Sequence, residues 1–199
     1  MPFIFKRLVL ILSITAAWAA DKESAAFRPG PISSYTHKQT NAQVTIAVEP
    51  FNTAEKEKPA FGKLDLYSFG VLPVLVIVQN SSDKTIRLEH LKAEYVGPNG
   101  NHIDATAAKD VQYVNGPSQP SITPGPPGLP PIGRGKKNKL NAPEVEGRAF
   151  AAQMLPAGQT ASGFLYFQTG LQRGATVVLD GLSEAVSGQQ LFYFEIPLE

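Results

Sequence analysis

The stretch Val74-Leu75-Val76-Ile77-Val78 decides the fold of this chain, and it leads from Pro73 into the polar sequence Gln79-Asn80-Ser81-Ser82-Asp83-Lys84. Four of the five residues are β-branched, and branched side chains suit a buried pleated surface better than a helix. Five residues are also too few for a buried helix. Because proline donates no backbone hydrogen bond, we expect the paired strand to begin just after Pro73. The rest of the chain is therefore expected to fold around one central strand.

Further short strands are predicted on both sides of the central one. Residues 44–48 alternate branched and small side chains, which indicates a half-buried strand. Residues 85–89 and 91–95 alternate with opposite parity, so we expect a bulge or a change of sheet near Glu89-His90. Later strands are predicted at 102–103, 163–168, 176–179 and 191–196. This series predicts an all-β protein, an antiparallel β-sandwich with one short helix and a disordered Pro/Gly-rich insertion.

The short helix is predicted in residues 144–155. Asn141 is placed as its N-cap, with Pro143 in the first turn and Glu144 after it. Gly147 disfavours a helix, so a strand through Phe150, Ala152 and Met154 stays open as an alternative. The charged residues 54–59 end in Pro59 and are expected to form a solvated loop or a single helical turn.

The first residues have the pattern of a secretory signal peptide. Lys6 and Arg7 precede an apolar run over 8–17 and the small residues 17–20, which predicts a leader over residues 1–19 with cleavage after Ala19. An uncleaved anchor is disfavoured because the run is shorter than the roughly 20 residues that a bilayer requires. The chain contains no cysteine, so neither a disulfide nor a lipid on a cysteine is expected. We therefore expect a periplasmic or secreted protein with no stable membrane anchor.

Two segments of the processed chain differ in composition from a packed domain. Residues 20–41 are polar and are expected to form a flexible lead-in to a sandwich over 42–199. Residues 115–141 contain seven of the seventeen prolines and then a basic group, which predicts a disordered insertion. This insertion is either a tolerated loop or a contact region for a protein groove or an anionic surface. Its candidate contact residues are Pro124, Pro127, Pro130, Arg134, Lys136, Lys137 and Lys139.

The central strand raises the question of what covers its outer face. A strand in an exposed two-layer sandwich alternates apolar and polar residues, whereas residues 74–78 are apolar on both faces. Leu75 and Ile77 therefore need a cover. We expect either the chain's own segment 144–155 or another molecule, and in the second case Leu75 and Ile77 form an interaction surface. The aromatic residues at 164–167 and 192–194 are expected in the core, with a contact surface as the alternative.

Three motifs together resemble a known family. They are the branched strand ending in Asn80-Ser81-Ser82-Asp83, the turn Leu155-Pro156-Ala157-Gly158-Gln159 and the strand Gly163-Phe164-Leu165-Tyr166-Phe167. This series resembles the immunoglobulin-like domains of unknown function in bacterial exported proteins and lipoproteins, over residues 43–198 apart from the insertion. The resemblance implies an immunoglobulin-like sandwich and brings no catalytic residues with it. Unlike the lipoprotein members, this chain has no cysteine for lipidation.

The motifs of catalysis and metal binding are missing or scattered. His37, His90 and His102 have no second ligand at metal spacing, so we expect no metal and no other cofactor. The chain has no cysteine nucleophile and no Gly-x-Ser-x-Gly elbow, and its formal charge of +1 does not favour nucleic acid. We therefore predict an exported, non-catalytic binding or structural domain for protein–protein or envelope association. The alternative is an envelope hydrolase whose site is assembled from scattered carboxylates such as Asp65, Glu94 and Asp104.

Overall fold

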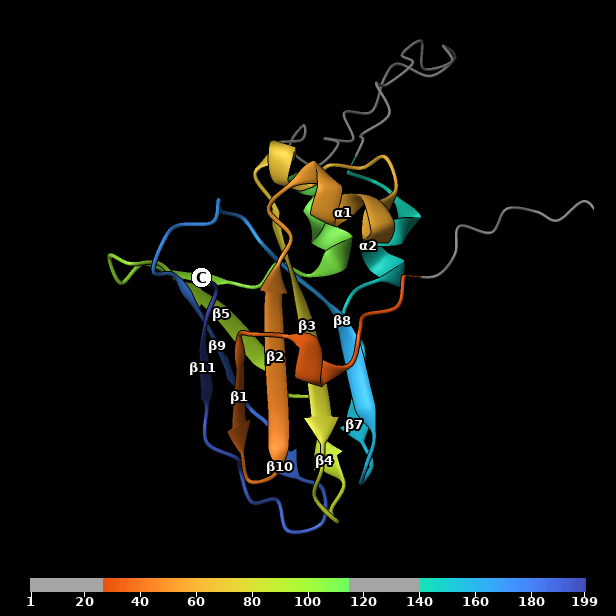
Figure 1. Cartoon of the computed structure of the whole chain (residues 1–199), viewed down its shortest axis with the longest axis vertical. Helices are drawn as coiled ribbons and strands as arrows, with labels where there is room; N and C mark the ends of the chain where they lie inside the picture. The colour runs from red at the N-terminus through yellow and green to blue at the C-terminus, as the bar shows by residue number, and fades with distance from the viewer. Residues whose placement is uncertain (1–26, 115–139) are drawn as a thin grey trace, which may run out of the picture.

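The central strand is β3 (Leu72–Asn80), which lies in the middle of a four-stranded sheet. A computed structural model describes residues 27–114 and 140–199 (Figure 1). Strand β3 pairs antiparallel with β2 (Val44–Pro50) on one side and with β8 (Thr160–Phe167) on the other. The hairpin partner β1 (Lys38–Asn41) completes the sheet in the order β1-β2-β3-β8. The predicted signal peptide over 1–19 and residues 115–139 of the predicted insertion, with all seven of its candidate contact residues, lie outside the described residues.

A second four-stranded sheet packs against the first. Its order is β11 (Phe194–Pro197), β9 (Thr176–Asp180), β5 (Lys92–Val96) and β6 (His102–Asp104). A small third sheet contains β10 (Ser183–Glu184), β4 (Ile86–Arg87) and β7 (Met154–Leu155). Figure 1 shows the first sheet in front and strands β5, β9 and β11 behind it. The strands named for the described residues pair antiparallel in three sheets, and the few helices are short, in agreement with the predicted all-β class.

The helices of the described residues are short. They are α1 (Ala54–Phe61), α2 (Pro143–Gly147) and three 3-10 turns, η1 (Ile32–Ser34), η2 (Tyr67–Phe69) and η3 (Ala108–Tyr113). In Figure 1, α1 and α2 lie next to one another at one end of the sheets. Within residues 27–114 and 140–199, no helix has both the length and the apolar content that crossing a bilayer requires.

The two faces of β3 belong to two separate hydrophobic clusters. Val74, Val76 and Val78 point into the cluster between the two large sheets. Leu75 and Ile77, only 1% and 2% exposed, belong to a second cluster on the outer face. The residues that cover this outer face come from α1, η3, α2 and neighbouring loops, and include Phe51, Phe61, Leu66, Val111, Leu140 and Val145.

The cover over Leu75 and Ile77 is therefore this chain itself. Val145, from the predicted covering segment 144–155, is part of it, but α1 and η3 contribute as well. The interaction role predicted for Leu75 and Ile77 needs exposed side chains, and the structure buries both. We correct that prediction: these two residues pack the outer cluster.

The segment predicted as a flexible lead-in is partly folded. Phe27 lies with its ring centroid 5.9 Å from that of Phe51 and 5.6 Å from that of Phe164. Farther along, β1 pairs with β2 over its whole length, from Lys38 opposite Ala47 to Asn41 opposite Val44. The described part of this lead-in, residues 27–41, is thus anchored by one aromatic side chain and one hairpin, and the packed domain begins before residue 42.

Several element boundaries also differ from the predictions. Strand β3 begins at Leu72 and not, as predicted, after Pro73. Proline lacks an N–H donor, but the Pro73 carbonyl accepts a hydrogen bond from the Phe51 N–H at 2.8 Å, so Pro73 is part of the strand. The charged residues 54–59 belong to an eight-residue helix, α1. The predicted helix 144–155 contains only the five residues of α2, with Ala142 and not Asn141 as N-cap. The change of sheet near Glu89-His90 is confirmed, since β4 and β5 belong to different sheets. Strand β11 starts only at Phe194.

Candidate functional site

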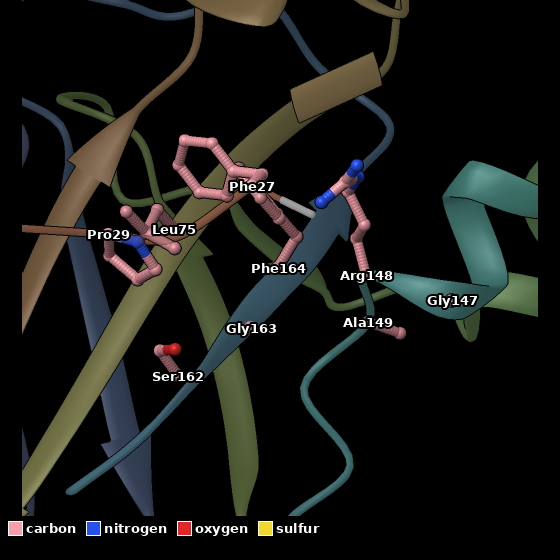
Figure 2. Close-up of a pocket in the computed structure, with 9 residues that line it drawn as sticks. All are labelled: Phe27, Pro29, Leu75, Gly147, Arg148, Ala149, Ser162, Gly163 and Phe164. Atoms are coloured by element: carbon pink, nitrogen blue, oxygen red, sulfur yellow. The ribbon is translucent and has the colours of Figure 1, made fainter. Parts of the chain in front are cut away.

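A pocket of about 200 Å³ lies on the outer side of β8. Figure 2 shows Arg148 and Phe27 near one end of this pocket and Ser162 near the other. Three parts of the chain form it: the start of the described lead-in, the strand pair β3–β8 and the residues that follow α2. Its lining residues are Phe27, Pro29, Leu75, Gly147, Arg148, Ala149, Ser162, Gly163 and Phe164. We refer to it below as the Arg148 pocket.

The residues after α2 are held at the edge of β8 by backbone hydrogen bonds. The Phe164 N–H donates to the Arg148 carbonyl at 2.8 Å, and the Phe150 N–H donates to the Phe164 carbonyl at 3.0 Å. Gly163 makes this approach possible, because a Cβ there would lie 2.4 Å from Phe150 Cα and 2.6 Å from Phe150 N. The position of Arg148 is therefore fixed from the backbone of the sheet.

Aromatic rings form the apolar wall of the pocket. Phe164 lies at the centre of an aromatic group, with ring centroids 4.9 Å from Phe51, 4.8 Å from Phe61 and 5.6 Å from Phe27. The Cζ atom of Arg148 lies 5.9 Å from the Phe27 ring centroid, within the range of a cation–π contact. The guanidinium is thus held beside an aromatic surface.

The guanidinium of Arg148 lacks an anionic partner in the described structure. Its Nε is buried and has no hydrogen-bond acceptor, and none of the ion pairs found within residues 27–114 and 140–199 includes Arg148. The Tyr166 hydroxyl donates to the Val145 carbonyl at 2.7 Å. Burial raises the pKa of Tyr166, and the positive charge of Arg148 opposes this rise. A buried donor without an acceptor costs about 1 to 3 kcal/mol, so a ligand that supplies an acceptor is favoured here.

The residues that line the Arg148 pocket are suited to binding a ligand and lack the groups that would catalyse a reaction. A guanidinium presents several N–H donors in a plane and matches a carboxylate or phosphate in two-point hydrogen bonding. The lining contains one hydroxyl, Ser162, but none of the nine lining residues is a histidine, a carboxylic acid or a lysine that would activate it. The arrangement therefore fits recognition of an anionic group beside an apolar surface.

The other residues that the sequence singled out lie away from this pocket and, for the most part, apart from one another. His37 lines a different cavity, and His90 is paired with Glu89 at 3.4 Å on the surface. His102 Nδ1 lies 2.8 Å from Glu94 Oε2, and Glu94 is directly opposite Asp104 on β5 and β6. Asp65 accepts from the Ser68 N–H and supports η2.

Of the three carboxylates in the hydrolase alternative, Glu94 and Asp104 are neighbours on paired strands, and Asp65 lies elsewhere, beside η2. Glu94 and His102 are both exposed on their strand pair, and neither residue lines the pockets described for this chain. Within residues 27–114 and 140–199, no group of three or more His, Cys, Asp or Glu side chains is arranged to hold a metal ion. No observation in this part of the structure favours the hydrolase.

Sequence reasoning missed the main residues of the pocket. The sequence predicts Arg148 within a helix over 144–155, whereas it follows the end of α2. Phe27 lies in a stretch with no apolar periodicity, and its one signal is that it is one of two aromatic residues in the polar segment 20–41. Gly163 was assigned only to a strand. The contact between these residues is tertiary, so no local pattern identifies it.

Comparison with known proteins gives no family for the chain. No protein-family model matches it, and no curated protein matches it. Solved structures that it resembles include a candidate lipoprotein, ycdA, of Bacillus subtilis, at 13% identity and a TM-score of 0.39. The match covers 80% of this chain and 38% of ycdA, so this chain spans well under half of that protein.

Two other solved structures are similar at the same level. The yjhA protein of Bacillus subtilis is 10% identical with a TM-score of 0.39, and the match covers 81% of this chain and 96% of yjhA. A functionally unknown protein from Listeria monocytogenes is 10% identical with a TM-score of 0.36, and the match covers 83% of this chain and 82% of that one. At such TM-scores these likenesses establish neither a shared fold family nor a shared function.

Proposed function

We propose that this protein is an exported, non-catalytic, immunoglobulin-like β-sandwich that binds a partner through an anionic group held in the Arg148 pocket. The leader pattern over residues 1–19 supports export to the periplasm or beyond the cell. The packing of two antiparallel four-stranded sheets across a shared core supports the sandwich. Mass spectrometry of protein recovered from the periplasm tests the export step, with a chain starting at Ala20 as the expected result.

The single observation that carries the binding proposal is the partly buried guanidinium of Arg148, whose Nε has no hydrogen-bond partner and which takes part in none of the ion pairs found within residues 27–114 and 140–199. The Phe27 ring offsets part of the cost of this burial but accepts no conventional hydrogen bond. A carboxylate offers two oxygen acceptors in the plane of the guanidinium, and hydrogen bonds to charged groups are worth about 1.5 to 3 kcal/mol. The guanidinium is therefore preorganised to bind an anion in this pocket.

The walls of the pocket narrow the class of ligand further. The partly exposed Phe27 ring lies next to the guanidinium, the nearly buried Leu75 and Phe164 form the apolar floor beneath it, and a volume of about 200 Å³ admits a small group. A carboxylate attached to a short apolar stem fits both features. The chain end or an acidic side chain of a partner protein supplies such a group, in agreement with the predicted protein–protein role. The proline-rich insertion stays a second predicted contact region.

The test uses a pair of small probes that differ only in charge. The probes are 3-phenylpropionate and its neutral analogue 3-phenylpropan-1-ol, titrated into the isotopically labelled protein and followed by NMR. We expect the acid to shift the amide signals of Ala149 and Gly163, with the alcohol binding about tenfold more weakly or not at all. Arg148→Met keeps the length of the stem and removes the charge, so this variant is expected to bind both probes equally weakly.

Arg173→Met is the matched control, because Arg173 is exposed and lies outside the Arg148 pocket. It is expected to leave the preference for the acid unchanged. Equal affinity of the normal protein for the acid and the alcohol contradicts the proposal. A preference for the acid that survives Arg148→Met contradicts it as well.

A further inference from the structure

A second surface with a different chemistry lies between the edge strands β1 and β11. It is an open groove of about 520 Å³ lined by Lys38, Gln39, Asn41, Phe192, Tyr193 and Glu195. None of these residues lines the Arg148 pocket. We call it the β1–β11 groove.

Two aromatic rings in this groove are exposed to solvent. Phe192 is 79% exposed and Tyr193 57%, although Phe194 next to them is fully buried. Strand β11 begins only at Phe194, and its residues then alternate between buried and exposed. Burying a phenylalanine side chain stabilises a fold, and the exposed Phe192 does not contribute this stabilisation. Neighbouring exposed rings of this kind are typical of a surface that meets a ligand.

The polar side chains of the groove are partly fixed in place. Gln39 Oε1 accepts a hydrogen bond from the Glu195 N–H at 2.8 Å, which ties the edge of β1 to the edge of β11. Lys38 Nζ donates to the Ser33 carbonyl at 3.1 Å. The side-chain amide of Asn41 adds a further donor and acceptor at the rim. The groove therefore combines two exposed rings that precede β11 with side-chain amide groups on β1.

The charge of the groove also restricts its ligand. The lining contains one lysine and one glutamate, so its formal charge is zero. It has no net attraction for an anion or a cation, in contrast to the Arg148 pocket. A neutral ligand with many hydroxyl groups and one apolar face matches this lining.

We infer that the β1–β11 groove binds a neutral oligosaccharide. A pyranose ring has a face of C–H groups that stacks on aromatic rings and an edge of hydroxyl groups that pairs with amides and carboxylates. Phe192 and Tyr193 supply the stacking surface, and Asn41, Gln39 and Glu195 supply the polar contacts. A second copy of this chain is less well matched, because a stable protein interface buries about 800 Å² per partner and this groove offers only two apolar side chains.

The test uses saturation-transfer NMR with cellohexaose, maltohexaose and chitohexaose as probes. We expect at least one hexasaccharide to bind, with the strongest saturation on its ring C–H protons. Phe192→Ala and Tyr193→Ala are each expected to weaken this binding about tenfold or more, whereas Tyr193→Phe retains a stacking ring and most of the affinity. Val186→Ala is the control, since Val186 is 99% exposed but lies outside the groove. Arg148→Met is expected to leave saccharide binding unchanged.

Three results would overturn this inference. One is that none of the three hexasaccharides binds to the full chain. Another is that one of them binds but both alanine variants keep its affinity. The third is a dimer in sedimentation experiments that Phe192→Ala converts to a monomer, which would assign the groove to a second copy of the chain. Failure of the anion test at Arg148 has no bearing on these outcomes, because the two sites share no residue.

Discussion

At the level of single residues, Glu57 shows how a charged side chain is used inside this fold. It is fully buried on α1, and its two carboxylate oxygens accept from the Leu66 N–H at 2.5 Å and the Tyr67 N–H at 2.9 Å. These N–H groups stand at the start of η2, so Glu57 connects α1 to the turn that leads into β3. Burial raises the pKa of Glu57 from 4.5 to about 7; the two N–H groups oppose this rise and the nearby Asp65 charge adds to it.

This pKa predicts that the protein loses stability as the pH rises. The folded state binds the Glu57 proton more tightly than the unfolded state, so the stabilisation is complete below pH 4.5 and is lost as the pH passes through about 7. We expect this group to lower the free energy of unfolding by roughly 3 kcal/mol between pH 4.5 and 8, since one pKa unit corresponds to about 1.4 kcal/mol. Urea unfolding of the normal protein and of Glu57→Gln over this range measures the effect. The variant, which cannot titrate at this position, should lack this component, and an identical slope in both proteins contradicts the assignment.

Gly163 gives a second prediction at the residue scale. A methyl group at this position meets backbone atoms of Phe150 and Ala149 at less than 3.0 Å, and backbone cannot move aside as a flexible side chain can. Gly163→Ala is therefore expected to lower the free energy of unfolding by about 1 to 3 kcal/mol and to weaken anion binding in the Arg148 pocket. Chemical denaturation and the 3-phenylpropionate titration measure the two effects. Gly147→Ala is the control for the stability measurement alone, because nothing lies within 4 Å of the added methyl group there although Gly147 also lines the pocket.

At the scale of elements, the hairpin between β1 and β2 is held by an unusual turn. Its two loop residues, Ala42 and Gln43, have φ values of 46° and 62°, a left-handed conformation that favours Asn and Gly. Gln43→Gly is expected to raise the free energy of unfolding by about 1 kcal/mol, because it relieves this strain and keeps the Gln43 carbonyl that accepts from the Ser81 N–H. Ala42→Val is expected to lower it. Thermal unfolding of both variants checks the prediction, and a destabilised glycine variant would show that the turn is not strained.

The elements that the sequence predicts well are those with a local cause. Strand β3 was predicted from its branched residues, and the switch of sheets after Arg87 from the change in alternation. The elements predicted poorly owe their structure to distant partners. Helix α1 is rich in charge, and Glu57 is buried in it only because η2 supplies two donors. Strand β1 is polar throughout, and its hydrogen bonds to β2 are what order it.

At the scale of the whole molecule, the sequence predicted that the outer face of β3 must be covered but not fully by what. The apolar run requires two buried faces, which is a local property of residues 74–78. Val145, from the predicted covering segment 144–155, is part of this cover, whereas Phe27 also contributes from a polar segment without apolar periodicity. The Arg148 pocket lies in this cover. Its residues meet only through tertiary contacts, so no local sequence pattern indicates it. The aromatic residues divide likewise: Phe164, Tyr166, Phe167 and Phe194 are in the core, whereas Phe192 and Tyr193 are exposed.

The two hydrophobic clusters on either side of β3 are expected to unfold together, in one cooperative transition. Leu72 belongs to the cluster between the sheets, Leu75 to the cluster under the helices, and both side chains are buried. If the helical cover is part of the folded core, Leu72→Ala and Leu75→Ala should each lower the free energy of unfolding by about 2 to 5 kcal/mol. Val186→Ala, at an exposed site, should change it by less than about 0.5 kcal/mol. Denaturation followed by circular dichroism and by tyrosine fluorescence should give one coincident transition for all three variants. A loss below about 1 kcal/mol for Leu75→Ala alone would mean that the cover is loosely attached, and the outer face of β3 would again be available to a partner.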